Sequence, residues 1–166
     1  LQSGALVLAS EAVGAAGVSG FSSIEKTGAG NLTLGFTPST VPSTLAVLDE
    51  TLRLTADLTV ADTGPDPLIS GRAFVTTTVT GTSFAELVVG DGTRSVTLDI
   101  ARGLGMQGRS RVVVEAGATV APGTGGLTGD AADQAVVVRG QLQSGLGLGA
   151  GVDRADIAAG GRITGP

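Results

Sequence analysis

The most constraining feature of the sequence is a strict alternation of apolar and polar residues over positions 52–60. Every even-numbered position in this segment is apolar and every odd-numbered position is polar. A period of two places all apolar side chains on one face of a β-strand, whereas a helix would distribute them around its surface. Residues 96–100 repeat the pattern. Both segments therefore predict strands with one buried and one exposed face.

Further strands are predicted where aliphatic residues cluster between turn-forming residues. They span residues 5–9, 31–36, 73–80, 84–89, 111–115 and 135–139. The valine runs at 112–114 and 136–138 indicate strands that are partly covered on both faces. Gly, Pro, Asp and Ser dominate the breaks between strands and favour turns. Only residues 10–18 and 130–134 are candidates for short helical turns.

Short strands separated by turns build either a β-sandwich or a β-solenoid. A sandwich usually fills the ~10 Å between its sheets with aromatic side chains. Here aromatic residues make up 2% of the chain, and the last of them is Phe84. A solenoid needs only small and branched residues, since its coils lie ~4.8 Å apart. The sequence favours an all-β solenoid of roughly seven coils, at ~20–25 residues per coil. A β-sandwich, or a mixed fold with a sandwich-like first half, is the alternative.

The length of the chain, 166 residues, suits one domain. We predict a single β-rich unit over residues 1–166, or a fragment of a longer repetitive protein, with a subdivision near residue 72 or 104. The tetrapeptide Leu-Gln-Ser-Gly occurs at 1–4 and again at 142–145, as in a longer repeat. The first residues contain neither an initiator methionine nor a signal peptide, so we interpret the chain as an internal or processed segment.

The composition excludes several classes of function. Histidine and cysteine are absent, which excludes nucleophile systems that need an imidazole and zinc, copper and iron sites built on these ligands. The net charge of −5 disfavours nucleic acid, whose phosphates need a basic face, and disfavours anionic membrane surfaces. No apolar run approaches the ~18 residues of a membrane span. We therefore expect that the protein is not an enzyme and has no transmembrane segment.

Paired aspartates are the candidate metal ligands, because calcium needs several oxygens converging on one point. The pairs are Asp62 with Asp66, Asp130 with Asp133, and Asp153 with Asp156. The first two pairs are the calcium candidates, and calcium is the only cofactor we consider. Residues 125–130 read GGLTGD, one position out of register with the calcium-binding repeat Gly-Gly-x-Gly-x-Asp. The alternative is that these carboxylates only form turns.

Two further patterns suggest binding or catalysis. Threonine occupies every second position at Thr76, Thr78, Thr80 and Thr82. This pattern predicts a row of hydroxyls on one face of a strand, as on ice-binding solenoids. The alternative is a Thr-rich solvent face with good β-propensity. Residues 23–26 read SIEK and match the Ser-x-x-Lys pattern of acyl-transferring serine enzymes. That chemistry needs the lysine one helical turn from the serine. An extended backbone would place the two on opposite faces, so we interpret the match as coincidence.

Residues 25–34 read EKTGAGNLTL and resemble the autotransporter-associated β-strand repeat, which favours a Lys-Thr-Gly-x-Gly-x-Leu-x-Leu run. Residues 114–123, VEAGATVAPG, are similar to the coil edges of the same β-helical passengers. After Leu34 the family usually continues through Ser-Gly into a turn with Asn and Tyr, whereas this chain continues Gly-Phe-Thr-Pro. The resemblance covers about a fifth of the chain. It implies a right-handed parallel β-solenoid on an exported, surface-displayed protein that serves adhesion or display, and it supplies no catalytic residues.

We therefore expect a non-enzymatic, extracellular structural or adhesive protein of a bacterial surface: an adhesin passenger segment, or a subunit of a self-assembling filament or surface layer. Self-association would use strand edges or stacked coils, with residues 5–9 or 135–139 as donated strands. A surface glycan is a further candidate partner.

Two alternatives belong to other classes of function. The first is a β-helical polysaccharide lyase or hydrolase, in which Arg102, Arg109 and Arg111 polarise an acidic sugar and Asp99 takes part. The second is a small module that binds glycan or ice.

Overall fold

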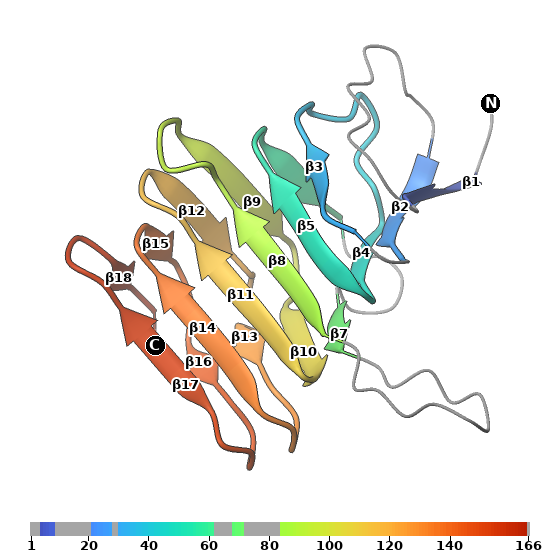
Figure 1. Cartoon of the computed structure of the whole chain (residues 1–166). Coiled ribbons are helices and arrows are strands. Elements are labelled where there is room, and N and C mark those ends of the chain that lie inside the picture. Colours follow the sequence, from blue (N-terminus) through green and yellow to red (C-terminus); the bar gives the residue numbers. More distant parts are fainter. Residues whose placement is uncertain (1–3, 9–20, 28–29, 62–67, 72–83, 166) are drawn as a thin grey trace, which may run out of the picture.

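The fold is a β-solenoid of about five turns (Figure 1). The computed structural model describes residues 4–8, 21–27, 30–61, 68–71 and 84–165. These residues form strands, turns and bends, contain no helix, and pair their strands only in parallel. Within this part of the chain, then, no helix is long and apolar enough to cross a membrane. The predicted all-β solenoid is confirmed.

Three parallel sheets build the stack. From residue 44 onward each coil passes from sheet A to sheet B and then to sheet C, whereas the described strands before it lie in sheets A and B. Sheet A contains β1 (Gly4–Leu8), β2 (Phe21–Lys26), β4 (Thr44–Val47), β7 (Leu68–Gly71), β10 (Leu104–Gly108), β13 (Leu127–Thr128) and β16 (Leu146–Gly147). Sheet B contains β3 (Leu32–Leu34), β5 (Glu50–Leu54), β8 (Ala85–Val89), β11 (Ser110–Val114), β14 (Gln134–Val138) and β17 (Arg154–Ile157). Sheet C contains β6 (Leu58–Val60), β9 (Val96–Ile100), β12 (Ala118–Ala121), β15 (Gln141–Leu142) and β18 (Arg162–Ile163).

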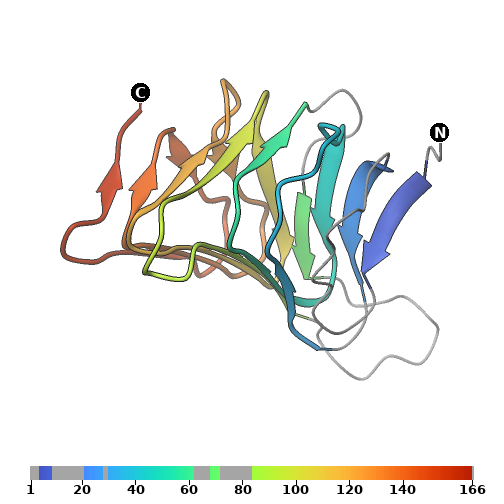
Figure 2. The same ribbon diagram turned by 90° about the horizontal axis from the view of Figure 1, so that it is seen from above.

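The coils wind in the right-handed sense. In Figure 1 the chain rises through sheet B at the front, crosses over to sheet C and returns through sheet A behind, while successive coils lie further to the left. This is the hand that parallel crossovers strongly prefer. Figure 2 shows the coils side by side along one axis, with the two termini at opposite ends of the stack.

The register explains why the chain forms about five coils where roughly seven were expected. Leu98 pairs with Val120, and Val120 with Leu142, so these coils advance by 22 residues each. Leu58, in contrast, pairs with Leu98, which lies 40 residues further along the chain. That single coil takes up the length of nearly two, which a count based on uniform repeats does not include.

The core consists of aliphatic side chains stacked on their counterparts in the next coil. In sheet B the inward positions of β5, β8, β11 and β14 are fully or almost fully buried; these residues are Leu52, Leu54, Leu87, Val89, Val112, Val114, Val136 and Val138. Phe36 only packs against the edge of this core. Val113 is buried on the outer face as well and Val137 is half-buried, which confirms the expectation drawn from the valine runs.

Three local predictions need correction. Residues 52–60 form two strands, β5 and β6, with a corner at 55–57. The alternation of apolar and polar residues indicates which side chains face inward, and it continues across the corner, so it does not show where one strand ends and the next begins. Residues 130–134 form a bend that leads into β14 and not a helical turn. The first half is not sandwich-like, because β2 pairs with β4 and β3 with β5 in parallel. The predicted helical turn at 10–18 and the predicted strand at 73–80 lie outside the described residues.

Candidate functional site

The outer face of sheet B brings together charged side chains that are far apart in the sequence. Because the strands are parallel and in register, outward positions form ranks across the coils. One rank contains Thr51, Glu86, Arg111, Ala135 and Arg154, and the next contains Arg53, Val88, Val113, Val137 and Asp156. Glu115 and Arg139 follow β11 and β14 at the edge next to sheet C.

These ranks enclose a shallow groove of about 240 Å³, which we call the sheet B groove. Its floor is apolar, and its walls are charged. The floor consists of Val88, Val113 and Val137, and the walls consist of Arg53, Glu86, Arg111, Glu115 and Arg139. The long charged side chains cover the valines, since Val88 and Val113 are buried although they point outward.

Glu86 is the best-anchored charge of the groove. Its Oε1 accepts a hydrogen bond from Thr51 Oγ1 at 3.1 Å, and its Oε2 accepts one from Arg111 Nε. The guanidinium of Arg111 also lies 5.7 Å from the centroid of the Phe84 ring, within the range of a cation–π contact. A buried carboxylate is stable only when it is paired and hydrogen-bonded. The contacts therefore hold both Glu86 and Arg111 in fixed positions and tie β5, β8 and β11 together.

The guanidinium groups lie above the carboxylates. The side chain of Arg111 is 45% exposed, whereas that of its partner Glu86 is 9% exposed. Arg139 Nη1 bonds Glu115 Oε2 at 3.2 Å across neighbouring coils, again with the arginine the more exposed partner. The groove contains three arginines and two glutamates, and its outermost charges are positive. This is a local reversal on a chain with a net charge of −5.

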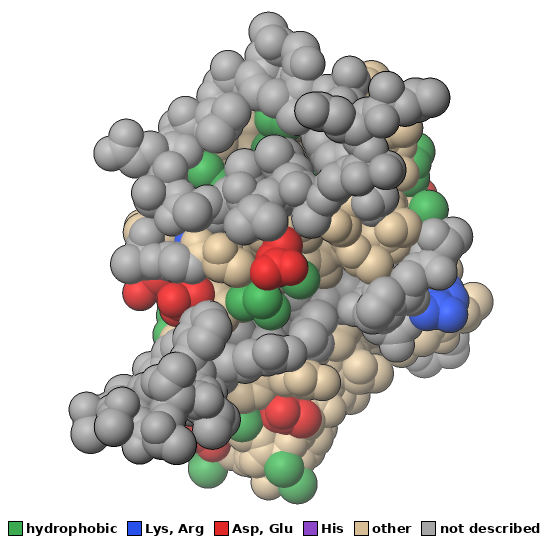
Figure 3. Space-filling model, turned by 90° about the vertical axis from the view of Figure 1, so that its right-hand side faces the viewer, with side chains coloured by type: hydrophobic (Ala, Val, Ile, Leu, Met, Phe, Trp, Pro, Cys, Tyr) green, Lys and Arg blue, Asp and Glu red, His purple; other side chains and the backbone are tan. Residues whose placement is uncertain are grey.

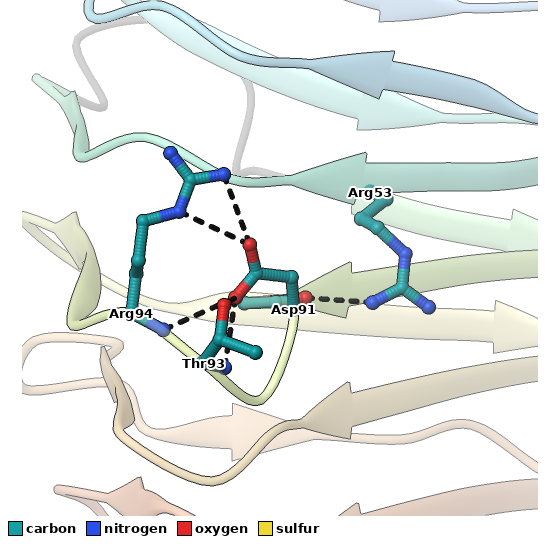
Figure 4. Close-up of polar contacts among 5 residues, drawn as sticks. Arg53, Asp91, Thr93 and Arg94 are labelled. Carbon is teal, nitrogen blue, oxygen red and sulfur yellow. Dashed lines mark hydrogen bonds and ion pairs between the residues drawn. The ribbon is translucent and has the colours of Figure 1, made fainter.

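Arg53 differs from the other arginines of this face. Its Nη1 donates a 2.7 Å hydrogen bond to the carbonyl of Gly90, at the base of the turn between β8 and β9. Figure 4 shows Arg53 approaching this turn from the side opposite to Arg94. Among the described arginines on sheet B, Arg53 is the one with no carboxylate partner.

The nearby carboxylate of Asp91 is fully engaged within its own turn. Asp91 Oδ1 accepts hydrogen bonds from the hydroxyl of Thr93 at 2.7 Å, from the backbone N–H of Thr93 at 2.9 Å and from that of Arg94 at 3.1 Å. Its Oδ2 accepts one from Arg94 Nη2 at 3.0 Å. These donors, the Thr93 hydroxyl first, hold the pKa of Asp91 far below its ordinary value. Asp91 therefore stays ionised and orders the turn.

The calcium candidates that can be placed act as acceptors for backbone amides. Asp130 accepts hydrogen bonds from Ala132 N at 2.8 Å and from Gly108 N at 3.0 Å, as well as from the Gln134 side chain. Burial works against ionisation of Asp130, but these donors outweigh it and lower its pKa. Asp133 Oδ1 accepts from Val152 N of the next coil at 3.0 Å.

The other calcium and threonine candidates cannot be placed. Asp62, Asp66 and the row Thr76, Thr78, Thr80 and Thr82 lie outside the described residues. In the part of the chain that the structure describes, no three His, Cys, Asp or Glu side chains gather as a metal site would require. On the end face seen in Figure 3, the acidic side chains lie in separate places.

The residues considered for an acidic sugar do not converge. Asp99 lies on β9 in sheet C, whereas Arg111 lies on β11 in sheet B. Arg109 lines a depression with Arg111 beside Phe84, but Arg102 lines a different one near Gly125. The structure therefore does not assemble these residues into one centre.

Ser23 and Lys26 lie on opposite faces of β2, as expected for an extended backbone. Lys26 is fully buried, and its Nζ donates to the carbonyls of Thr27 at 3.1 Å and Asp49 at 3.3 Å. Burial lowers the pKa of Lys26, although the charges of Asp49 and Glu50 oppose this shift. Sequence reasoning did not foresee this buried amine, because lysine normally lies at the surface.

Comparisons of the chain with models of protein families, with curated proteins and with solved structures found no match. The candidate site therefore depends on the geometry of sheet B. Sequence reasoning missed Arg53, Glu86, Glu115 and Arg139, and singled out Arg111 for a different grouping. Charged residues at the outward positions of the predicted strands were a signal of this site, but they can be assigned to one surface only when the register of the strands is known.

Proposed function

We propose that the chain is a non-enzymatic, extracellular structural element of a bacterial surface, which extends and attaches through the stacking of its coils. The resemblance of residues 25–34 to an autotransporter repeat supports the surface location. The lack of His and Cys supports a role without nucleophilic or metal chemistry of those types. The observation that carries the proposal is the set of strand edges at β16, β17 and β18, which pair on one side only among the described residues and on which a further coil, of the same protein or of a second copy, can stack.

Ile157 is the residue that marks this exposed end. It occupies the inward rank of sheet B and pairs with Val138, which is almost fully buried. Ile157 itself is 55% exposed. Among the described strands, β17 pairs only with β14, β16 only with β13 and β18 only with β15. Another coil of the same cross-section would bury Ile157 and extend all three sheets, since an open strand edge is a template for pairing.

Light scattering of the purified chain, over a range of concentrations and with and without calcium, tests this proposal. We expect particle mass to rise with concentration. Ile157→Lys places a charge on the stacking face and should abolish the rise. Val41→Lys is the matched control, because Val41 is an apolar side chain of the same 55% exposure and lies outside the strands, between β3 and β4, away from this end. A chain that stays monomeric under all conditions, or two variants that act alike, would contradict the proposal.

A further inference from the structure

We propose that the sheet B groove binds the carboxylate of an acidic sugar unit, held by Arg53, Arg111 and Arg139 above the floor formed by Val88 and Val113. The inference adds a ligand to the adhesive role and does not depend on self-assembly, because the groove lies on a side face of the stack and not on its end.

The first argument is charge complementarity. Glu86 and Glu115 each pair with one arginine, which leaves the charge of Arg53 without a carboxylate partner. The guanidinium groups are also the more exposed members of their ion pairs. A single anionic group in the groove would therefore balance the net positive charge of the groove. On entering, it would contact the N–H donors of the arginines before the buried carboxylates.

The second argument is preorganisation. Arg53 is fixed by Gly90 O, Arg111 by Glu86 and Phe84, and Arg139 by Glu115. Each guanidinium has five N–H donors, and only one N–H donor of each is used in these hydrogen bonds. Arg53 and Arg111 lie on strands two apart, about 10 Å across the sheet, with Val88 on the strand between them. Binding would therefore order few additional side-chain torsions, which favours affinity.

The third argument concerns the ligand class. A groove of about 240 Å³ is smaller than the ~300–1,000 Å³ of a typical drug-sized site, so it suits a single unit of a polymer. β8, β11 and β14 are interior strands paired on both sides, so this face offers no edge for an added peptide strand. Glu115, whose side chain is 20% exposed, can accept hydrogen bonds from sugar hydroxyls. Recognition through arginine also suits a chain without Trp or Tyr.

The test is calorimetric titration of the dispersed protein with a short oligogalacturonate. The same oligomer as its methyl ester, which removes the charge and adds one methyl group per carboxyl, serves as the neutral ligand, and a short poly-glutamate represents acidic peptides. We expect binding of the free acid and at least about tenfold weaker binding of the ester, because a charge-assisted contact is stronger than a neutral one. We also expect at least about tenfold weaker binding of poly-glutamate, because it offers the same charge but no sugar hydroxyls to donate to Glu115.

Variants connect the binding to the groove. Arg53→Gln should weaken oligogalacturonate binding about tenfold or more, and Arg53→Lys should weaken it less, since lysine keeps the charge but loses the planar fork. Arg162→Gln is the matched control, because it removes the same charge from an exposed position on sheet C and should change binding less than twofold. Circular dichroism checks that each variant is folded.

Several results would overturn the inference. These are absence of binding to the free acid, equal binding of acid and ester, equal binding of poly-glutamate, or equal losses for Arg53→Gln and Arg162→Gln. None of these results bears on self-assembly, which light scattering measures separately.

Discussion

Replacement of Leu87 by alanine tests the packing of the solenoid at its centre. Leu87 is fully buried on β8 and is stacked between Leu52 of the preceding coil and Val112 of the following one. The change removes three carbon atoms, worth about 2.4 kcal/mol in transfer free energy at ~0.8 kcal/mol each. A cavity term adds to this, because Leu→Ala changes in protein cores cost about 2.7–5.0 kcal/mol in total.

The geometry places Leu87→Ala in the upper half of that range. Backbone ladders on both sides hold β5 and β11 in register with β8, so the neighbouring side chains cannot move in to fill the space. We therefore expect a loss of about 4 kcal/mol in the free energy of unfolding, a large share of the ~5–15 kcal/mol typical of a domain.

Urea denaturation followed by far-ultraviolet circular dichroism measures this loss. Val152→Ala is the control, because Val152 is highly exposed and its replacement should change the free energy of unfolding by less than about 0.5 kcal/mol. A loss of less than about 1.5 kcal/mol for Leu87→Ala would show that the site collapses freely, and would refute the argument that the ladders hold the coils apart.

Three further predictions concern backbone and charge. Gly123→Ala should strongly lower the melting temperature, because the new Cβ would lie 2.3 Å from a backbone oxygen of the preceding coil. Gly92 also has a positive φ but has open space around it, so Gly92→Ala should lower the melting temperature much less. Equal decreases in melting temperature for the two variants would contradict the clash. The stabilisation from Asp91, whose folded pKa is lowered, should be fully present above the ordinary carboxyl pKa of ~3.9 and be lost as pH falls towards the folded value. Amide exchange in the 90–94 turn would show this, and Asp91→Asn should remove the dependence. Lys26 is buried with a lowered pKa, so the unfolded chain binds the proton of this amine more tightly, and the free energy of unfolding should rise with pH up to about 10.4. Lys26→Met should abolish that rise in urea titrations. The same dependence of stability on pH in the variant would contradict this assignment.

Much of the fold could be predicted from the sequence, because its signal is local. The alternation at 52–60 and 96–100 identifies inward and outward side chains without knowledge of the partner strands. The scarcity of aromatic residues correctly favoured stacked coils over a sandwich. The number of coils could not be predicted, because the coil between β6 and β9 is nearly twice as long as the coil that follows it. No local sequence pattern indicates that this coil is longer than the others.

The candidate site could not be predicted, because it depends on register. Arg53, Glu86 and Arg111 are neighbours only because β5, β8 and β11 align in one arrangement, and a slip by one residue would turn these side chains inward. Asp130 illustrates the converse case. Its sequence context suggested a metal ligand, but the folded chain brings backbone amides to both of its oxygens.

Negative-stain electron microscopy of the purified chain tests the central claim most directly, since that claim is about shape and stacking. The account predicts narrow rods that join end to end into longer filaments, with the Ile157→Lys variant giving separate short rods. A field of compact globules that never associate, in the unaltered chain at high concentration, would contradict it.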